Sequence, residues 1–132
     1  MLLSLRFRPD ASTWPSGPTE SALTPVLAAL AMRPGYLRGW VGRSPDDAGI
    51  LLLAAEFDSI GNGRRALSAT DLRPILWPLL PAAIDDISIF EPLAVCAPNE
   101  APHSLVSALA ADAGEFRLGT SSSGAENSPP EQ

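Results

Sequence analysis

The side chains that could do chemistry are few in this sequence of 132 residues. His103 is the only histidine and Cys96 the only cysteine. One cysteine excludes an internal disulfide and a multi-cysteine metal site. Cys96 also has no basic neighbour in sequence, which favours an inert thiol over a nucleophile.

Two acidic pairs, Asp46 with Asp47 and Asp85 with Asp86, lie in turn-like sequence. No set of histidines or glutamates accompanies either pair, so both are interpreted as turn residues rather than metal ligands. We therefore expect no metal site and no cofactor.

Three further groups leave two interpretations open. Asn62 could orient a substrate hydroxyl or serve a helix start between its two glycine neighbours. Arg64 and Arg65 could hold an acidic ligand or form a solvated helix edge. Trp77 could line a pocket and donate its indole N–H, or it could fill the core.

Charge and composition exclude several partners. The net charge is −6, and all nine basic residues are arginine, so nothing predicts nucleic-acid binding. Residues 1–95 hold eight arginines and ten acids, whereas residues 96–132 hold one arginine and five acids. Arg6 interrupts the N-terminal apolar run too early for a membrane span or a signal-peptide core. With a lone cysteine, we expect a cytoplasmic protein.

The periodicity predicts four strands and two helical regions. Strands are expected near residues 2–8, 36–43, 49–58 and 87–95, with helices between the first two and between the last two. This βαββαβ order predicts an α+β, ferredoxin-like fold with an antiparallel sheet and helices on one face. We expect this domain to span residues 1–95. Residues 96–132 are expected to form an acidic Ala/Ser/Gly/Pro-rich tail, disordered apart from a short helix near 102–112.

Strand parity assigns side chains to the two faces of the sheet. The helix-covered face is expected to hold Leu3, Leu5, Phe7, Leu37, Val41, Leu51, Leu53, Ala55, Phe57, Ser88 and Phe90. The opposite face is expected to hold Arg6, Arg8, Tyr36, Arg38, Trp40, Ile50, Leu52, Ala54, Glu56, Asp58, Ile87, Ile89 and Glu91. This second face is too apolar to stay exposed to water, so we expect it to pack against a second copy in a homodimer. Trp40 could pack there or border a ligand site.

We expect the charges of this second face to pair with one another. Strands one and three are central neighbours in this topology, so Arg6 and Arg8 are expected beside Glu56 and Asp58, with Glu91 flanking them.

The sequence around the second and third strands resembles a known family. Arg33-Pro34-Gly35-Tyr36-Leu37-Arg38-Gly39 runs through Ser44-Pro45-Asp46-Asp47 into Leu51-Leu52-Leu53-Ala54-Ala55-Glu56-Phe57-Asp58-Ser59, followed by Arg64-Arg65-Ala66-Leu67-Ser68-Ala69. This block resembles the antibiotic biosynthesis monooxygenase family, particularly its short stand-alone members. The resemblance implies a dimeric α/β barrel.

The resemblance also implies a function. Enzymatic members of the family oxidise hydroxylated polycyclic or quinol-type substrates with O₂ and without metal or flavin, and a related branch degrades haem. Their substrate lies between sheet and helices, which makes Phe7, Phe57, Asn62, Trp77, Ser88 and Phe90 the ligand-pocket candidates. The chain departs from the family pattern at Phe57, where tryptophan is common, and at Ala66, where histidine is common. These departures argue against haem degradation.

Two functions therefore stay open. The chain could be a cofactor-independent monooxygenase or oxidase acting on an aromatic or quinol-type small molecule, whose own anion would reduce O₂. It could instead be a non-catalytic dimeric module that binds an apolar molecule or serves as an accessory subunit. No base is evident on the predicted covered face, where Ser88 is the only polar side chain. An enclosed cavity with convergent polar groups would favour the enzyme, and a filled core the module.

Overall fold

A computed structural model of the chain describes residues 1–8 and 20–107. The chain divides into two compact units, Met1–Pro92 and Leu93–Gln132, each treated by itself below. The sequence prediction placed this boundary at residue 95.

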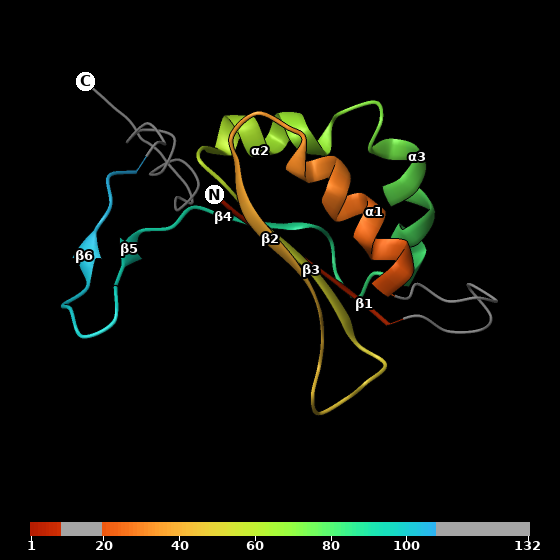
Figure 1. The fold of residues 1–132 in the computed structure, drawn as a ribbon, viewed down its shortest axis with the longest axis horizontal. Helices are drawn as coiled ribbons and strands as arrows, with labels where there is room; N and C mark the ends of the chain where they lie inside the picture. Colours follow the sequence, from red (N-terminus) through yellow and green to blue (C-terminus); the bar gives the residue numbers. More distant parts are fainter. Residues whose placement is uncertain (9–19, 108–132) are drawn as a thin grey trace, which may run out of the picture. The chain divides into compact units, whose positions relative to one another are not determined.

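The first unit is a four-stranded antiparallel sheet with helices on one side (Figure 1). The elements follow one another as β1 Leu2–Phe7, α1 Glu20–Ala31, β2 Tyr36–Arg43, β3 Leu51–Phe57, α2 Ile60–Leu67, α3 Arg73–Leu76, the 3₁₀ helix η1 Trp77–Ala82 and β4 Ser88–Phe90. The strand order is β2-β3-β1-β4, so β1 and β3 are central neighbours as predicted. The ferredoxin-like α+β fold is confirmed.

Local chemistry explains where the helices begin and break. Ser59 caps α2, because its Oγ accepts a hydrogen bond from the backbone N–H of Asn62 at 3.1 Å. The helical region that follows α2 is irregular. It splits into α3 and η1, since Pro78 and Pro81 have no N–H to continue an α-helical ladder. α3 starts after Leu72 without a side-chain cap.

The core lies between the sheet and the helices. Phe7 and Phe57 are 0% and 1% exposed. They pack among leucines of β1 and β3 and the buried Leu23, Leu30 and Leu72 of the helical layer. Alternation along β1 and β3 therefore predicted their covered face correctly.

The predicted face was wrong at the start of β2. Tyr36 pairs with Phe57 and Arg38 with Glu56, so Leu37 is an extra residue in a bulge. Tyr36 consequently turns towards the helices and meets Phe57 edge to face, with ring centroids 5.7 Å apart. Leu37 is left 56% exposed.

The predicted face of β4 was also wrong. Ile89 pairs with Leu3, and both Ile87 and Ile89 pack against the core. Ser88 and Phe90 therefore point to the opposite face, where Phe90 is 57% exposed. Either parity of this short strand offers a large apolar residue, so its own sequence did not decide which side is buried.

The second unit contains a small hairpin where the sequence predicted the end of a strand and a helix. Ala94–Val95 (β5) pairs with His103–Ser104 (β6), whereas β4 already ends at Phe90. Residues 102–107 of the predicted helix include β6, and residues 108–112 lie outside the described part of the chain. Cys96 is exposed, and its thiol donates to the Glu100 carbonyl at 2.9 Å.

A pair of aromatic substitutions tests the packing. We expect Phe57→Ala to lower the free energy of unfolding by about 3–5 kcal/mol, because it opens a cavity in the core. Trp77→Ala, at a side chain that is 57% exposed, should cost no more than about 1 kcal/mol. Urea unfolding followed by circular dichroism measures both. Equal losses of unfolding free energy in the two variants would show that Phe57 contributes no more to core packing than the exposed Trp77.

Candidate functional site

The space between the sheet and the helices is filled with apolar side chains. Phe7 and Phe57, two of the predicted pocket residues, lie in its centre as core. Among the described residues, no polar or charged residue is buried. In the part of the core that the structure describes, the groups that would hold or deprotonate a substrate are therefore missing.

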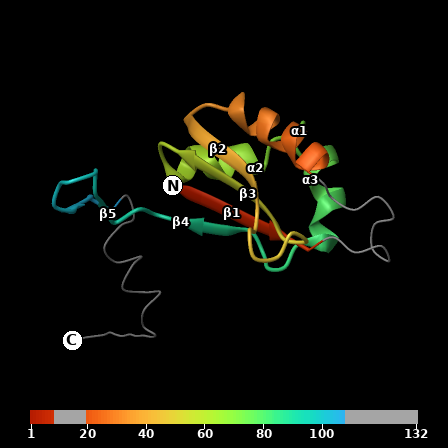
Figure 2. The same cartoon turned by 60° about the horizontal axis from the view of Figure 1, so that its bottom comes forward.

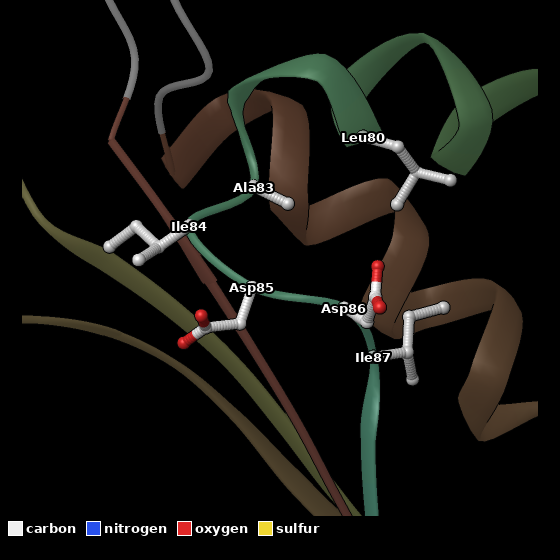
Figure 3. Close-up of a pocket in the computed structure, with 6 residues that line it drawn as sticks. All are labelled: Leu80, Ala83, Ile84, Asp85, Asp86 and Ile87. Atoms are coloured by element: carbon white, nitrogen blue, oxygen red, sulfur yellow. The ribbon is translucent and has the colours of Figure 1, made fainter.

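A pocket of about 680 Å³ opens instead beside the start of β4 (Figure 3). Its lining residues come from η1 and the segment that follows: Leu80, Ala83, Ile84, Asp85, Asp86 and Ile87. Apart from two carboxylates, these side chains are aliphatic. The pocket thus offers an apolar surface and acidic hydrogen-bond acceptors, the combination typical of small-molecule sites.

A bulge against β1 creates this arrangement. Ala83 forms a β-bridge with Phe7, and Ser88 pairs with Ser4. The chain therefore takes five steps from residue 83 to residue 88 opposite only three steps of β1. The surplus lies in residues 85–87, which leave the ladder. Bulges of this kind redirect side chains and are common next to functional sites.

The two aspartates of the bulge point in different directions. Asp85 forms an ion pair with Arg6 of β1. Asp86 points to the other side of the segment, into the space that Leu80 and Ile87 border (Figure 3). The sequence pattern predicted that both are turn residues. No sequence signal separated them, because the Arg6 contact that does so is 79 residues away.

The opposite face of the sheet forms a second surface. All helices lie on one side (Figure 2), so in the described part of the first unit no helix covers the other side, called the open face below. Cross-strand pairing sets out its side chains in rows: Phe90, Leu2, Glu56 and Arg38; then Ser88, Ser4, Ala54 and Trp40; then Arg6, Leu52 and Gly42. Trp40 is 50% exposed, with the Arg38 guanidinium 5.7 Å from its ring centroid.

The ion pairs of this face differ from the predicted network. Because β1 and β3 are antiparallel, Glu56 lies opposite Leu2 while Arg6 lies opposite Leu52, about 13 Å further along β1. Glu56 accepts a hydrogen bond from Arg38 at 2.8 Å instead. The prediction that Arg6 pairs with Glu56 was therefore wrong.

The other charged residues predicted to share this network also have different partners or positions. Arg8 pairs with Asp47 at 2.8 Å, which joins β1 to the β2–β3 turn. This hydrogen bond from Arg8, with one from the Gly49 N–H, lowers the pKa of Asp47. The Asp58 carboxylate accepts a hydrogen bond from the side-chain amide of Asn62 at 2.8 Å. Glu91 follows the end of β4 and is half-buried.

A second, smaller pocket of about 400 Å³ lies beside the turn that joins β2 to β3. Arg6, Gly42, Arg43, Ser44, Pro45, Ile50 and Leu52 line it. Gly42, Leu52 and Arg6 share a row of the open face, so a second copy on that face would reach this pocket.

The other predicted pocket residues do not converge. Asn62 lies in a surface chain, donating to Asp58 and accepting from Arg65 at 2.7 Å. Trp77 is exposed beneath the Arg73 guanidinium, 5.4 Å from its ring centroid. The Ser88 hydroxyl donates to the Asp86 carbonyl at 3.4 Å, which links it to the bulge.

The described residues contain neither a metal-ligand cluster nor a membrane-spanning helix. Within residues 1–8 and 20–107, no group of three or more histidine, cysteine, aspartate or glutamate side chains could hold a metal ion. No helix in those segments is long and apolar enough to cross a membrane.

Double-mutant cycles test the charge pairing of the open face. Arg38→Met and Glu56→Leu should be coupled by about 0.2–1 kcal/mol, the usual range for an exposed ion pair. Arg6→Met and Glu56→Leu should be additive. The free energy of unfolding of each single and double variant gives both values. Coupling in the second cycle alone would contradict the strand register.

Comparison with known proteins places the fold. No protein-family model and no curated protein matches this sequence. Among solved structures, SnoaB, a cofactor-independent oxygenase from Streptomyces nogalater, is similar with a TM-score of 0.59 and 21% identity over 75% of this chain and 96% of SnoaB. A candidate antibiotic biosynthesis monooxygenase from Deinococcus radiodurans has a TM-score of 0.58 and 20% identity over 75% of this chain and 97% of its own. Rv0793 from Mycobacterium tuberculosis has a TM-score of 0.53 and 13% identity, covering 83% of this chain and 96% of its own.

These likenesses cover the sheet and the helices rather than one motif, since they span nearly the whole of each solved chain. They agree with the strand order and with the resemblance found in the sequence. The chain thus has the ferredoxin-like fold of the antibiotic biosynthesis monooxygenase proteins.

Proposed function

We propose that this protein is a cofactor-independent oxygenase that acts on an aromatic or quinol-type small molecule. The observation that carries this proposal is the shared fold with SnoaB, a cofactor-independent oxygenase, over 96% of the SnoaB chain. The described residues add a pocket with an aliphatic wall and carboxylates, which suits a flat hydroxylated molecule.

The reaction requires little of the protein. In a hydroxylated anthrone, loss of a proton from the ring methylene gives a resonance-stabilised carbanion that can pass electrons to O₂. One oxygen atom then ends in the new carbonyl group, and the other leaves as water with the two methylene hydrogens. The substrate is the reductant and O₂ the oxidant. The protein must bind the substrate, exclude competing water and accept a proton.

The proposal includes a homodimer that forms through the open face. Trp40, Phe90 and Leu2 are exposed there, and Leu52 of the same face lines the smaller pocket. Large apolar side chains gathered on one face of a sheet are unfavourable in water and favour a partner sheet. A cytoplasmic location remains a prediction from the lone cysteine.

One observation favours the second candidate, a non-catalytic dimeric module that binds a small molecule or serves as an accessory subunit. The covered face around Phe7 and Phe57 is packed and apolar. An enzyme that held its substrate between sheet and helices would need space and a polar group there. The pocket beside β4 keeps the enzyme as the first candidate, because it offers both outside the packed core.

Sedimentation tests the dimer. At micromolar concentration we expect a species of twice 13.8 kDa. Trp40→Glu should shift it to monomer, because a charge would be buried against the partner sheet. Trp77→Glu changes a similarly exposed tryptophan on the helical side and should leave the dimer intact. A monomeric wild-type protein would overturn the dimer.

Oxygen consumption tests the activity. With dithranol, a hydroxylated anthrone, as the probe, we expect O₂ uptake well above the spontaneous rate. Isotopically labelled O₂ should place one labelled atom in the quinone product. Asp46→Asn, an exposed turn variant, should retain this activity. Dithranol that binds without faster O₂ uptake would favour the non-catalytic module.

A further inference from the structure

We infer that the bulge between η1 and β4 is the ligand site of this protein, and that Asp86 is its hydrogen-bond acceptor. The site takes a small molecule with a flat apolar body and a hydroxyl group. The choice of a hydroxyl group rests on the proposed function, whereas the location rests on the structure alone.

The shape of the pocket suits a flat apolar molecule. Leu80 of η1 and Ile87 before β4 provide aliphatic walls, and Ala83 adds a small side chain to the lining. The volume of about 680 Å³ is within the usual range for small-molecule sites, roughly 300–1,000 Å³. A bicyclic or tricyclic aromatic molecule could lie against this wall and remove apolar surface from water.

The two aspartates of the bulge have different partners. Arg6 neutralises Asp85 and holds it on the other side of the segment. No described cation lies within ion-pair distance of Asp86, whose carboxylate points into the pocket. A hydroxyl group of the ligand can therefore donate to Asp86, and a bond of this charge-assisted kind is stronger than a neutral one.

Backbone hydrogen bonds to β1 hold the bulge in place at both ends. Before the bulge, the Arg8 N–H donates to the Ala82 carbonyl at 2.8 Å, and the Ile84 N–H donates to the Arg6 carbonyl at 2.9 Å. After the bulge, Ser88 re-enters the ladder opposite Ser4. The bulge is thus a short segment tied to β1 at both ends, so Asp86 is presented in a defined direction.

The site is also compatible with a homodimer. Asp86 and Ile87 face the helical side, and Ile87 packs against the core. The open face proposed as the interface lies on the other side of the sheet. Dimer formation should therefore leave the pocket accessible.

Binding measurements with matched probes test the assignment. We choose naphthol, its methyl ether, which lacks the donor, and naphthylmethylamine, which carries a cation. Titrations of the full-length protein should show naphthol binding more tightly than the ether by about five- to tenfold, the effect of one partly exposed charge-assisted hydrogen bond. Asp86→Asn should remove most of that difference, and the Asp46→Asn control should retain it. Methyl NMR should place the shifts at Leu80 and Ile87.

Each other outcome overturns part of the inference. Equal binding of naphthol and its ether would remove the role of Asp86. Preference for the amine would assign the pocket to cationic ligands. Shifts at Ile50 and Leu52 would move the ligand to the smaller pocket. If naphthol binds through Asp86 but dithranol is not oxidised, the ligand site is supported and the proposed oxygenase activity is refuted. If Asp86→Asn oxidises dithranol as fast as the wild-type protein, the oxygenase activity is supported and this ligand site is refuted.

Discussion

The antiparallel pairing of β1 with both of its neighbours is the constraint on which the rest of this structure depends. β1 lies between β3 and β4, and its alternate side chains Leu3, Leu5 and Phe7 are buried against the helical layer. A slip of one residue would exchange these side chains with Arg6 and its neighbours, so burial strongly specifies the register. This register determines which residues face the helices, which lie on the open face and which charges meet.

The place where this pairing is interrupted is where a ligand site is proposed. Continuous ladder hydrogen bonds between β1 and β4 would leave side chains alternating between the two faces of the sheet. The surplus residues at 85–87 break that rule locally, and the Arg6 ion pair then separates Asp85 from Asp86. A polar group is thereby presented beside aliphatic walls without being buried in the core. The packed core and the site are adjacent but distinct, so the site does not require a cavity that would destabilise the domain.

The scarcity of chemical groups is consistent with the proposed chemistry. Where substrate and O₂ supply the electrons, the protein contributes binding, orientation and a proton acceptor. A pocket with carboxylates and an aliphatic wall provides these elements. The packed covered face remains the argument for a binding module, because among the described residues Phe7 and Phe57 are fully packed and no buried polar group accompanies them.

The sequence by itself determined the order of the elements and the buried faces of β1 and β3, because a period of two with one apolar parity reports burial within a single strand. The face of β4 was decided only by its pairing, since Ile89 and Phe90 are both large and apolar and Leu3 selects the first. The bulge that exposes Leu37 was likewise invisible, because it is a mismatch between two strands. The same holds for Arg6, whose acidic partner depends on the direction in which β3 runs and on a bulge 79 residues away. Local pattern reports what a segment buries, whereas register and direction are relations between segments, and in this protein those relations place the candidate site.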